Sequence, residues 1–90
     1  MISSIVSIKL YSKADCIYCT KAVNIIEKYE LMHLVTKETI DDVNERSLLK
    51  EKYNVKTFPI VIVNDELIGG YTELHRYIIR TCVMPEDNDF

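Results

Sequence analysis

The sequence is poor in the features that mark secreted, membrane-spanning and nucleic-acid-binding proteins. It has three cysteines in 90 residues, which are too few for the disulfide scaffold of a small secreted domain. No apolar run approaches the roughly 20 residues that a membrane-spanning helix needs. The formal net charge is −3, whereas a nucleic-acid-binding domain has a surplus of Lys and Arg on one face. We therefore expect a cytoplasmic protein with no membrane and no nucleic acid among its partners.

The N-terminal segment is apolar, but it lacks the basic region and the small-residue cleavage site of a signal peptide. Residues 5–11 alternate apolar and polar side chains, as a half-buried strand does. We interpret them as the first strand of the mature chain. A chain of 90 residues forms one domain, which we place at residues 1–84, followed by an acidic tail at residues 85–90.

The next segments predict a helix and a short strand. Residues 16–30 have apolar side chains at helical spacing, and these are Ala22, Ile25, Ile26 and Tyr29. The strand is expected to begin at residue 31 and to end between residues 35 and 37.

A second helix is expected to begin after Asp41 or Asp42, either of which can cap it, and to end near residue 53. Glu45 follows Asp42 at the spacing of a capping box. The side chains expected to point inward are Val43, Leu49 and Tyr53.

The following apolar run, residues 60–63, is rich in β-branched side chains and predicts a buried strand. Asn64 and Asp65 are a two-residue turn signal. Residues 66–68 are therefore expected to return as the partner strand of a hairpin.

A third helix is expected from Thr72, as its cap, to about Cys82, with Leu74, Ile78 and Cys82 facing inward. The element order is then β-α-β-α-β-β-α. A βαβ unit requires parallel strands, and the hairpin requires an antiparallel pair. The sequence therefore predicts an α/β fold with a mixed four-stranded sheet flanked by three helices. The first helix begins where the first strand ends, which is where α/β folds usually place their sites.

Cys16 and Cys19 form a CxxC pair at this strand-to-helix junction. A reactive cysteine has to be a thiolate near neutral pH. We expect the helix dipole, the unpaired N–H groups of the first turn and the nearby Lys13 together to lower the pKa of the Cys16 thiol. Cys19 lies on the same helical face, one turn deeper, and should be less exposed. This asymmetry predicts that Cys16 attacks a disulfide and that Cys19 resolves the mixed disulfide.

Two alternatives to a redox pair are an inert pair and half of a zinc site. Zinc would need two further Cys or His ligands. The remaining candidates are Cys82, His33 and His75, and none of them is paired at metal spacing. We expect no metal and no bound cofactor, and we assign no catalytic role to either histidine. Cys82 could have a regulatory role, but nothing except its presence indicates one.

Three segments carry a family resemblance. The first runs from residue 11 to residue 19 and includes a basic residue and the CxxC pair, the second is Thr57, Phe58 and Pro59, and the third begins at Gly69 and Gly70. In this order and spacing they resemble the glutaredoxins, over about residues 5–82. The resemblance implies a thioredoxin-like fold and an enzyme that reduces protein disulfides and glutathione mixed disulfides, with glutathione as the electron donor. The chain has no Trp, so the thioredoxin motif Trp-Cys-Gly-Pro-Cys is absent.

The resemblance also implies roles for single residues on one side of the site. Pro59 matches the family's cis-proline, which would present the backbone of Phe58 to a substrate, whereas a trans proline opening an edge strand is the alternative. Thr57 belongs to the same segment. Lys13 would reach a glutathione carboxylate, and Tyr18 would shape the groove beside the attacking cysteine.

On the other side, Gly69 and Gly70 would permit a close approach of the ligand to the backbone. Thr72 and Glu73, at a helix N-terminus, would hold the γ-glutamyl end of glutathione. A turn followed by an N-cap is the alternative interpretation of these residues. Lys56 could add a second positive charge.

The chain departs from the family pattern at three positions. Ile17 replaces the proline common within the motif, and some relatives without that proline bridge an iron–sulfur cluster between two subunits. Phe58 replaces the usual valine and enlarges the side chain beside the groove. Ile60 stands where a polar or basic residue often follows the proline, so one charge that would attract glutathione is missing.

These departures leave two rival functions beside a dithiol glutaredoxin. One is a redoxin that takes its electrons from a flavoprotein reductase, and the other is an iron–sulfur cluster carrier on the same fold. The leading function is that of a dithiol glutaredoxin, which is an electron-transport role. For it we expect a monomer whose partners are glutathione and proteins that contain a disulfide or bound glutathione.

Overall fold

The computed structural model describes residues 5–83, without the side chains of the last two. The predicted boundary at residue 84, the predicted acidic tail and the inward side chain of Cys82 lie outside this description. The elements, in chain order, are β1 (Ile8–Ser12), α1 (Ile17–Lys28), a 3-10 helix η1 (Met32–Leu34), β2 (Val35–Thr39), α2 (Val43–Tyr53), β3 (Ile60–Val63), β4 (Glu66–Gly69), α3 (Tyr71–Ile78) and a π-helical turn η2 (Ile79–Val83). This order confirms the predicted succession of strands and helices.

The sheet has four strands in the order β2-β1-β3-β4. β1 pairs with β2 in parallel, and its other edge pairs with β3 in the antiparallel direction. β3 and β4 form the antiparallel hairpin. The mixed sheet is therefore the one that the βαβ unit and the turn signal together predict.

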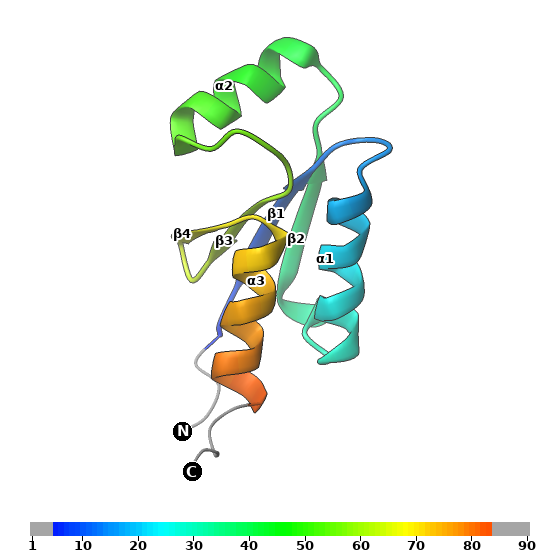
Figure 1. Cartoon of the computed structure of the whole chain (residues 1–90), viewed down its shortest axis with the longest axis vertical. Coiled ribbons are helices and arrows are strands. Elements are labelled where there is room, and N and C mark those ends of the chain that lie inside the picture. The colour runs from blue at the N-terminus through cyan, green and yellow to red at the C-terminus, as the bar shows by residue number, and fades with distance from the viewer. Residues whose placement is uncertain (1–4, 84–90) are drawn as a thin grey trace.

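The main core lies between the sheet and the pair of helices α1 and α3, which Figure 1 shows side by side in front of the strands. Alternate residues of β1 point into it, so Ile8, Leu10 and Ser12 are buried while Lys9 and Tyr11 are half-buried. The fully or nearly fully buried side chains of this core are Ile8, Leu10, Ala22, Ile26, Val61, Val63, Leu74 and Ile78. The inward positions predicted for the first and third helices are thus largely confirmed.

The first strand begins later than predicted, at Ile8 rather than at residue 5. The preceding backbone is held by the β3–β4 turn instead of by a neighbouring strand. Asn64 Oδ1 accepts hydrogen bonds from the backbone N–H groups of Val6 and Ser7 at 2.7 and 3.1 Å. These bonds satisfy the donors that a longer strand would have used.

The second strand also begins later than predicted, because residues 32–34 form the 3-10 helix η1. The N–H of Leu34 donates to the carbonyl of Leu31 at 3.0 Å. Leu31 itself is buried in the main core. Burial of this leucine turns the chain before it can pair with β1, so β2 starts at Val35.

The predicted hairpin turn is confirmed. Asn64 and Asp65 both have positive φ values, 53° and 67°, as the two central residues of a type I′ turn require. Asn and Asp tolerate this left-handed conformation better than most other residues do. The turn chemistry therefore explains why the strand reverses here.

Helix α2 has one of its two predicted caps but differs from the prediction in its packing. Asp42 caps it through a hydrogen bond from the N–H of Asn44 at 3.3 Å, and no reciprocal bond from Glu45 accompanies it among the bonds of the described chain. Val43 is 67% exposed, so its predicted inward orientation is wrong. Leu49 and Tyr53 are half-buried, as part of the rim of a second, smaller core. Figure 1 shows α2 beyond the ends of the strands rather than against the sheet.

Helix α3 is capped by Gly70 and not by Thr72, which corrects the prediction. The Glu73 carboxylate accepts a hydrogen bond from the N–H of Gly70 at 2.9 Å. A carboxylate at the third helical position is well placed to satisfy this free donor, which is why the helix is capped two residues earlier than predicted. The α-helix ends at Ile78, and the chain then forms the π-helical turn η2.

Candidate active site

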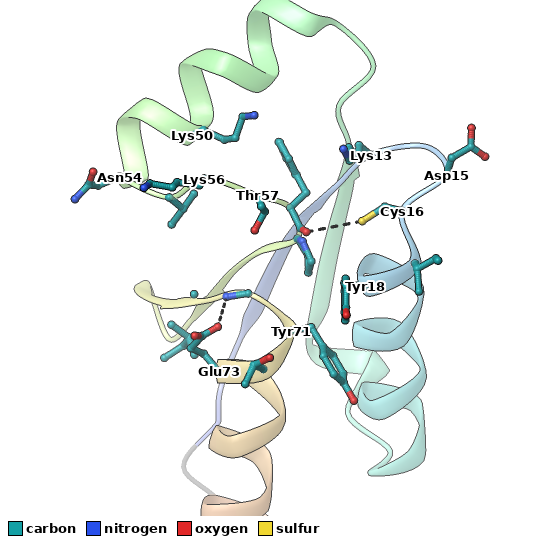
Figure 2. A pocket seen from close by; sticks show the side chains of 18 residues that line it. Lys13, Asp15, Cys16, Tyr18, Lys50, Asn54, Lys56, Thr57, Tyr71 and Glu73 are labelled. Carbon is teal, nitrogen blue, oxygen red and sulfur yellow. Dashed lines mark hydrogen bonds between the residues drawn. The ribbon is translucent and has the colours of Figure 1, made fainter.

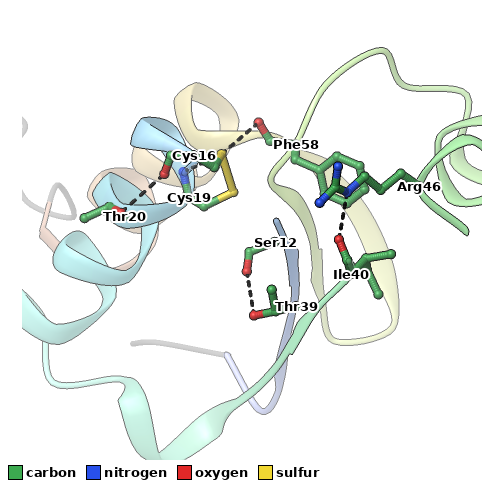
Figure 3. Close-up of a disulfide and its surroundings, with 8 residues drawn as sticks. All are labelled: Ser12, Cys16, Cys19, Thr20, Thr39, Ile40, Arg46 and Phe58. Carbon is green, nitrogen blue, oxygen red and sulfur yellow. Dashed lines mark hydrogen bonds between the residues drawn. A yellow bond between two sulfur atoms is a disulfide. The ribbon is translucent and has the colours of Figure 1, made fainter. Parts of the chain in front are cut away.

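The site is built around Cys16 and Cys19, whose sulfur atoms are joined in a disulfide (Figure 3). Cys16 is the N-cap of α1, and its Sγ accepts a hydrogen bond from the N–H of Cys19 at 3.2 Å. The expected contact between sulfur and the first helical turn is thus present. Cys16 is half-buried, whereas Cys19 is only 4% exposed. The predicted asymmetry in exposure between the two cysteines is confirmed.

The loop between β1 and α1 places Cys16 just beyond the C-terminal end of β1, a central strand of the sheet. Asp15 has a φ of 55°, a left-handed conformation that Asp tolerates, and it turns the chain sharply. Cys16 then has an extended backbone with φ −112° and ψ 109°, as an N-cap residue does. This backbone places the sulfur of Cys16 at the start of α1, at the rim of the smaller core.

The Phe58–Pro59 peptide bond is cis, as the resemblance implies. The carbonyl oxygen of Phe58 lies 3.9 Å from the Sγ of Cys16 (Figure 3). The backbone that precedes β3 is thus adjacent to the reacting sulfur. A bound substrate segment could pair with the polar groups of this backbone.

The large side chain of Phe58 was expected beside the groove. It does line the groove, but most of it is buried in the smaller core. It is 6% exposed and packs with Cys19, Ile40 and Ile60. Ile60 is fully buried in the same cluster. An apolar core behind the disulfide explains why an isoleucine, and not a charged side chain, follows Pro59 in this chain.

A groove of about 800 Å³ extends from Cys16 between α2 and α3 (Figure 2). It is lined by every residue for which the resemblance implies a binding role, namely Lys13, Tyr18, Thr57, Phe58, Pro59, Gly69, Gly70, Thr72 and Glu73. Lys56 lines it too, but the buried Cys19 does not. Three segments far apart in the sequence therefore converge on one cavity beside Cys16.

Several residues of this groove were not predicted from the sequence. Lys50, Asn54 and Val55 line one end of it, and Ile68 and Tyr71 line the other. One signal was available for the first group, because an Asn at a helix C-terminus often adopts the left-handed conformation that Asn54 has here. That turn brings the end of α2 back over the groove.

The structure requires glycine at only one of the two adjacent positions, Gly69 and Gly70. Gly69 has a φ of +132°, and a Cβ there would lie 2.9 Å from Cγ of Glu73, so the backbone itself requires glycine. Gly70 has an ordinary extended backbone, and a Cβ there would meet only ordinary contacts, the nearest at 3.5 Å from the carbonyl of Pro59. The fold therefore does not explain Gly70, and a close approach by a ligand would.

Charged groups of both signs surround the groove. Lys13, Lys50 and Lys56 line it together with Asp15 and Glu73. The hydrogen bond from the N–H of Gly70 is the main cause that lowers the pKa of the Glu73 carboxyl, with a smaller contribution from the positive charge of Arg76. Glu73 therefore carries its negative charge at neutral pH, opposite the three lysines of the groove.

A metal-binding cluster of three or more His, Cys, Asp or Glu side chains is absent from the part of the chain that the structure describes. In the same part, no helix is long and apolar enough to cross a membrane.

The glutaredoxin family model matches residues 8–68 of the chain, a range that includes both cysteines and Pro59. A comparison with curated protein sequences returned no match. Among solved structures, glutaredoxin 1 from Francisella tularensis, complexed with cacodylate, is 28% identical with a TM-score of 0.73, over 82% of this chain and 93% of its own. The reduced glutaredoxin of Escherichia coli is 25% identical with a TM-score of 0.59, over 82% and 94%. Wheat glutaredoxin, at 19% identity and a TM-score of 0.61 over 87% and 74%, shares the fold.

Proposed function

The chain belongs to the glutaredoxin family, and we propose that it is a glutathione-dependent thiol–disulfide oxidoreductase. The observation that carries the proposal is the half-buried Cys16, bonded to the buried Cys19 and opening onto a groove of mixed charge. The disulfide is the oxidised form of the pair. The two thiols are the reduced form, in which the chain reacts with a substrate.

In the first step, the Cys16 thiolate attacks one sulfur of the substrate disulfide. A mixed disulfide forms between Cys16 and the substrate, and the other substrate sulfur leaves as a thiolate. The N–H of Cys19 already donates to this sulfur in the oxidised form. The same bond and the positive end of the α1 dipole would stabilise the thiolate in the reduced form.

The second step depends on the substrate. With a protein disulfide, the Cys19 thiolate attacks the sulfur of Cys16, the second substrate thiolate leaves, and the Cys16–Cys19 disulfide forms. Two molecules of glutathione then reduce this disulfide and become one glutathione disulfide. With a glutathione mixed disulfide, the first step leaves glutathione bound to Cys16. A second glutathione thiolate attacks the sulfur of that bound glutathione, one glutathione disulfide forms and the Cys16 thiolate leaves, so Cys19 is not needed.

Glutathione carries two carboxylates and one ammonium group, and the groove offers charges that complement them. We assign the glycine carboxylate to the lysine side, Lys13 and Lys56. We assign the γ-glutamyl end to the N-terminus of α3, where the first-turn N–H groups would bind its carboxylate and Glu73 its ammonium group. Thr57 and the backbone of Phe58 would pair with the cysteinyl residue in between.

The experiment is steady-state turnover of a small glutathione mixed disulfide with glutathione, glutathione reductase and NADPH. The proposal predicts NADPH oxidation proportional to the concentration of the protein. The reaction should saturate with the mixed disulfide, because the groove binds the glutathionyl group before transfer. Absence of turnover above the uncatalysed rate would contradict glutathione dependence, and reduction by a flavoprotein reductase alone would identify a different electron donor.

A further inference from the structure

A strip of aromatic and basic side chains leads from the groove down the exposed face of α3. It consists of Tyr18, Tyr71, Thr72, His75, Arg76, Ile79 and Arg80, and it is called the α3 strip below. At its upper end the rings of Tyr18 and Tyr71 lie 6.0 Å apart, and both residues line the groove. Figure 2 shows these two rings facing each other between α1 and α3, below Cys16.

The aromatic part of the strip continues along α3. The His75 ring stacks on the Tyr71 ring, with 5.8 Å between centroids and 17° between planes. The ammonium group of Lys21 lies over the Tyr18 ring at 5.1 Å and over the Tyr71 ring at 5.9 Å. These contacts join the three rings into one continuous aromatic surface, and Lys21 adds a positive charge to it.

A second hollow, of about 490 Å³, forms the lower part of the strip. It is lined by Thr72, His75, Arg76, Ile79 and Arg80. Thr72 lines the groove as well, so the two cavities meet at this residue. The strip is therefore a continuation of the site beside Cys16 and not a separate surface feature.

The charge of the strip is opposite to that of the whole chain. The formal net charge is −3, yet the strip has two guanidinium groups and an imidazole at its lower end. Arg76 has one acidic neighbour, Glu73, whose carboxylate is already bound to the N–H of Gly70. Arg80 has no carboxylate in salt-bridge contact within residues 5–83. The two guanidinium groups therefore have donors that no carboxylate of residues 5–83 occupies, and they lie beside the apolar Ile79. Such a surface suits a negatively charged peptide.

We propose that the α3 strip docks an acidic segment of the protein whose disulfide Cys16 attacks. The proposal rests on the proposed function, since it assumes a protein substrate in the groove. From Thr72 to Arg80 the helix rises about 12 Å, which is about four residues of extended peptide. The substrate would therefore carry its acidic residues within several positions of the reacting cysteine, on the side that leaves the groove over Thr72.

The test uses glutathionylated peptides with one cysteine in an otherwise neutral sequence. Two acidic peptides are used, and in each of them four Asp or Glu residues begin four positions from the cysteine. The acidic residues precede the cysteine in one peptide and follow it in the other, so that both directions of the bound chain are tested. The reference peptide has Asn and Gln at those positions. The rate constant for transfer of glutathione from peptide to protein is measured by stopped flow at low and high salt.

The wild-type protein should react about tenfold faster with one acidic peptide than with its neutral reference at low salt, and the advantage should fall at high salt. The variant Arg76→Gln/Arg80→Glu should lose this advantage. The matched control is Lys37→Glu/Lys52→Gln, which changes the charge by the same amount at exposed lysines outside both cavities. It should keep most of the advantage.

Turnover of the small glutathione mixed disulfide separates this proposal from the proposed function. If the strip variant keeps that turnover and loses only the preference for the acidic peptide, the docking role is supported. Equal loss of preference in the strip variant and in the control would mean general charge attraction and would overturn the proposal. A preference that appears only after removal of residues 85–90, and only while Arg76 and Arg80 are intact, would also overturn the proposal, because the acidic tail would then be the occupant of the strip.

Discussion

The two flanks of the active-site groove are packed very differently. On one flank, α1 and α3 bury apolar side chains against the sheet, and Ile26, Leu74 and Ile78 are fully buried. On the other flank, α2 has no buried residue, and Val43 and Leu48 are 67% and 63% exposed. Figure 1 shows the first pair against the sheet and α2 away from it.

The reacting groups belong to the densely packed flank or to the sheet, while part of the charge comes from the loose flank. Cys16 and Cys19 begin α1, and Gly70 and Glu73 begin α3. Lys50 comes from α2. The difference teaches that the proposed disulfide exchange, which needs fixed geometry, would rest on well-packed elements, whereas the proposed charge recognition would partly rest on a helix with no buried residue.

The largest expected effect comes from truncating the packed flank. Leu74→Ala should lower the free energy of unfolding by about 2–5 kcal/mol, because it removes a fully buried side chain and leaves a cavity. The matched control on the loose flank is Leu48→Ala, which should change it by less than about 0.5 kcal/mol. Urea unfolding followed by circular dichroism gives both values. Similar losses in the two variants would mean that α2 is packed as firmly as α3.

The next largest effect concerns the two glycines at the start of α3. Gly69→Ala should destabilise the fold by about 1–3 kcal/mol, since its backbone conformation is one that alanine avoids. Gly70→Ser should stay within about 0.5 kcal/mol of the wild type, because serine suits an N-cap and the added atoms have room.

The same pair of variants also tests the ligand contact at Gly70. Gly70→Ser should raise the KM for the glutathione mixed disulfide while leaving the fold intact, as judged by the same unfolding curves. An unchanged KM would show that no ligand approaches this backbone closely.

A smaller effect is expected for the carboxylate of Glu73. Its pKa is lowered in the folded state, so its stabilising contribution is complete above the ordinary pKa of the group and is lost as the pH falls through the folded pKa. Glu73→Gln should therefore cost about 0.3–1 kcal/mol at pH 7, and the difference from wild type should shrink below the ordinary value of 4.5. Unfolding curves at pH 7 and pH 3 measure this. A difference that is constant with pH would contradict the role of the charge.

The smallest effect is expected on the loose flank. Lys50→Gln should raise the KM for the glutathione mixed disulfide about two- to fivefold, which corresponds to the modest strength of a solvent-exposed ion pair, and should leave kcat unchanged. Lys52→Gln, on the same helix but outside the groove, is the control and should change neither constant. A fall in kcat for Lys50→Gln would mean that α2 also positions the reacting sulfur.

The sequence predicted the packed flank better than the loose one. Apolar spacing located α1 and α3, and the Asn64–Asp65 turn located the hairpin, because these signals are local and agree with burial. Val43 was misplaced for the opposite reason. An exposed helix with little apolar contrast gives no pattern that indicates which face turns inward.

The residues of the candidate site were identified by motif and spacing, whereas their surroundings were not. The family resemblance implied that Pro59 and Gly70 lie near Cys16, but nothing local indicated that Lys50 or Tyr71 would reach the same groove. Whether Phe58 points into solvent or into the core depends on Cys19, Ile40 and Ile60, which come from other parts of the chain. Such contacts depend on tertiary packing and leave no local signal.

The most direct test of the account compares Cys16→Ser with Cys19→Ser on two substrates, a small glutathione mixed disulfide and a protein disulfide, both with glutathione as the reductant. Cys16→Ser should abolish turnover of both substrates, since no other sulfur of the described residues lines the groove. Cys19→Ser should keep turnover of the mixed disulfide and lose reduction of the protein disulfide, because only the second reaction needs the buried thiol. Equal loss of both activities in the two variants would contradict the division of labour between Cys16 and Cys19.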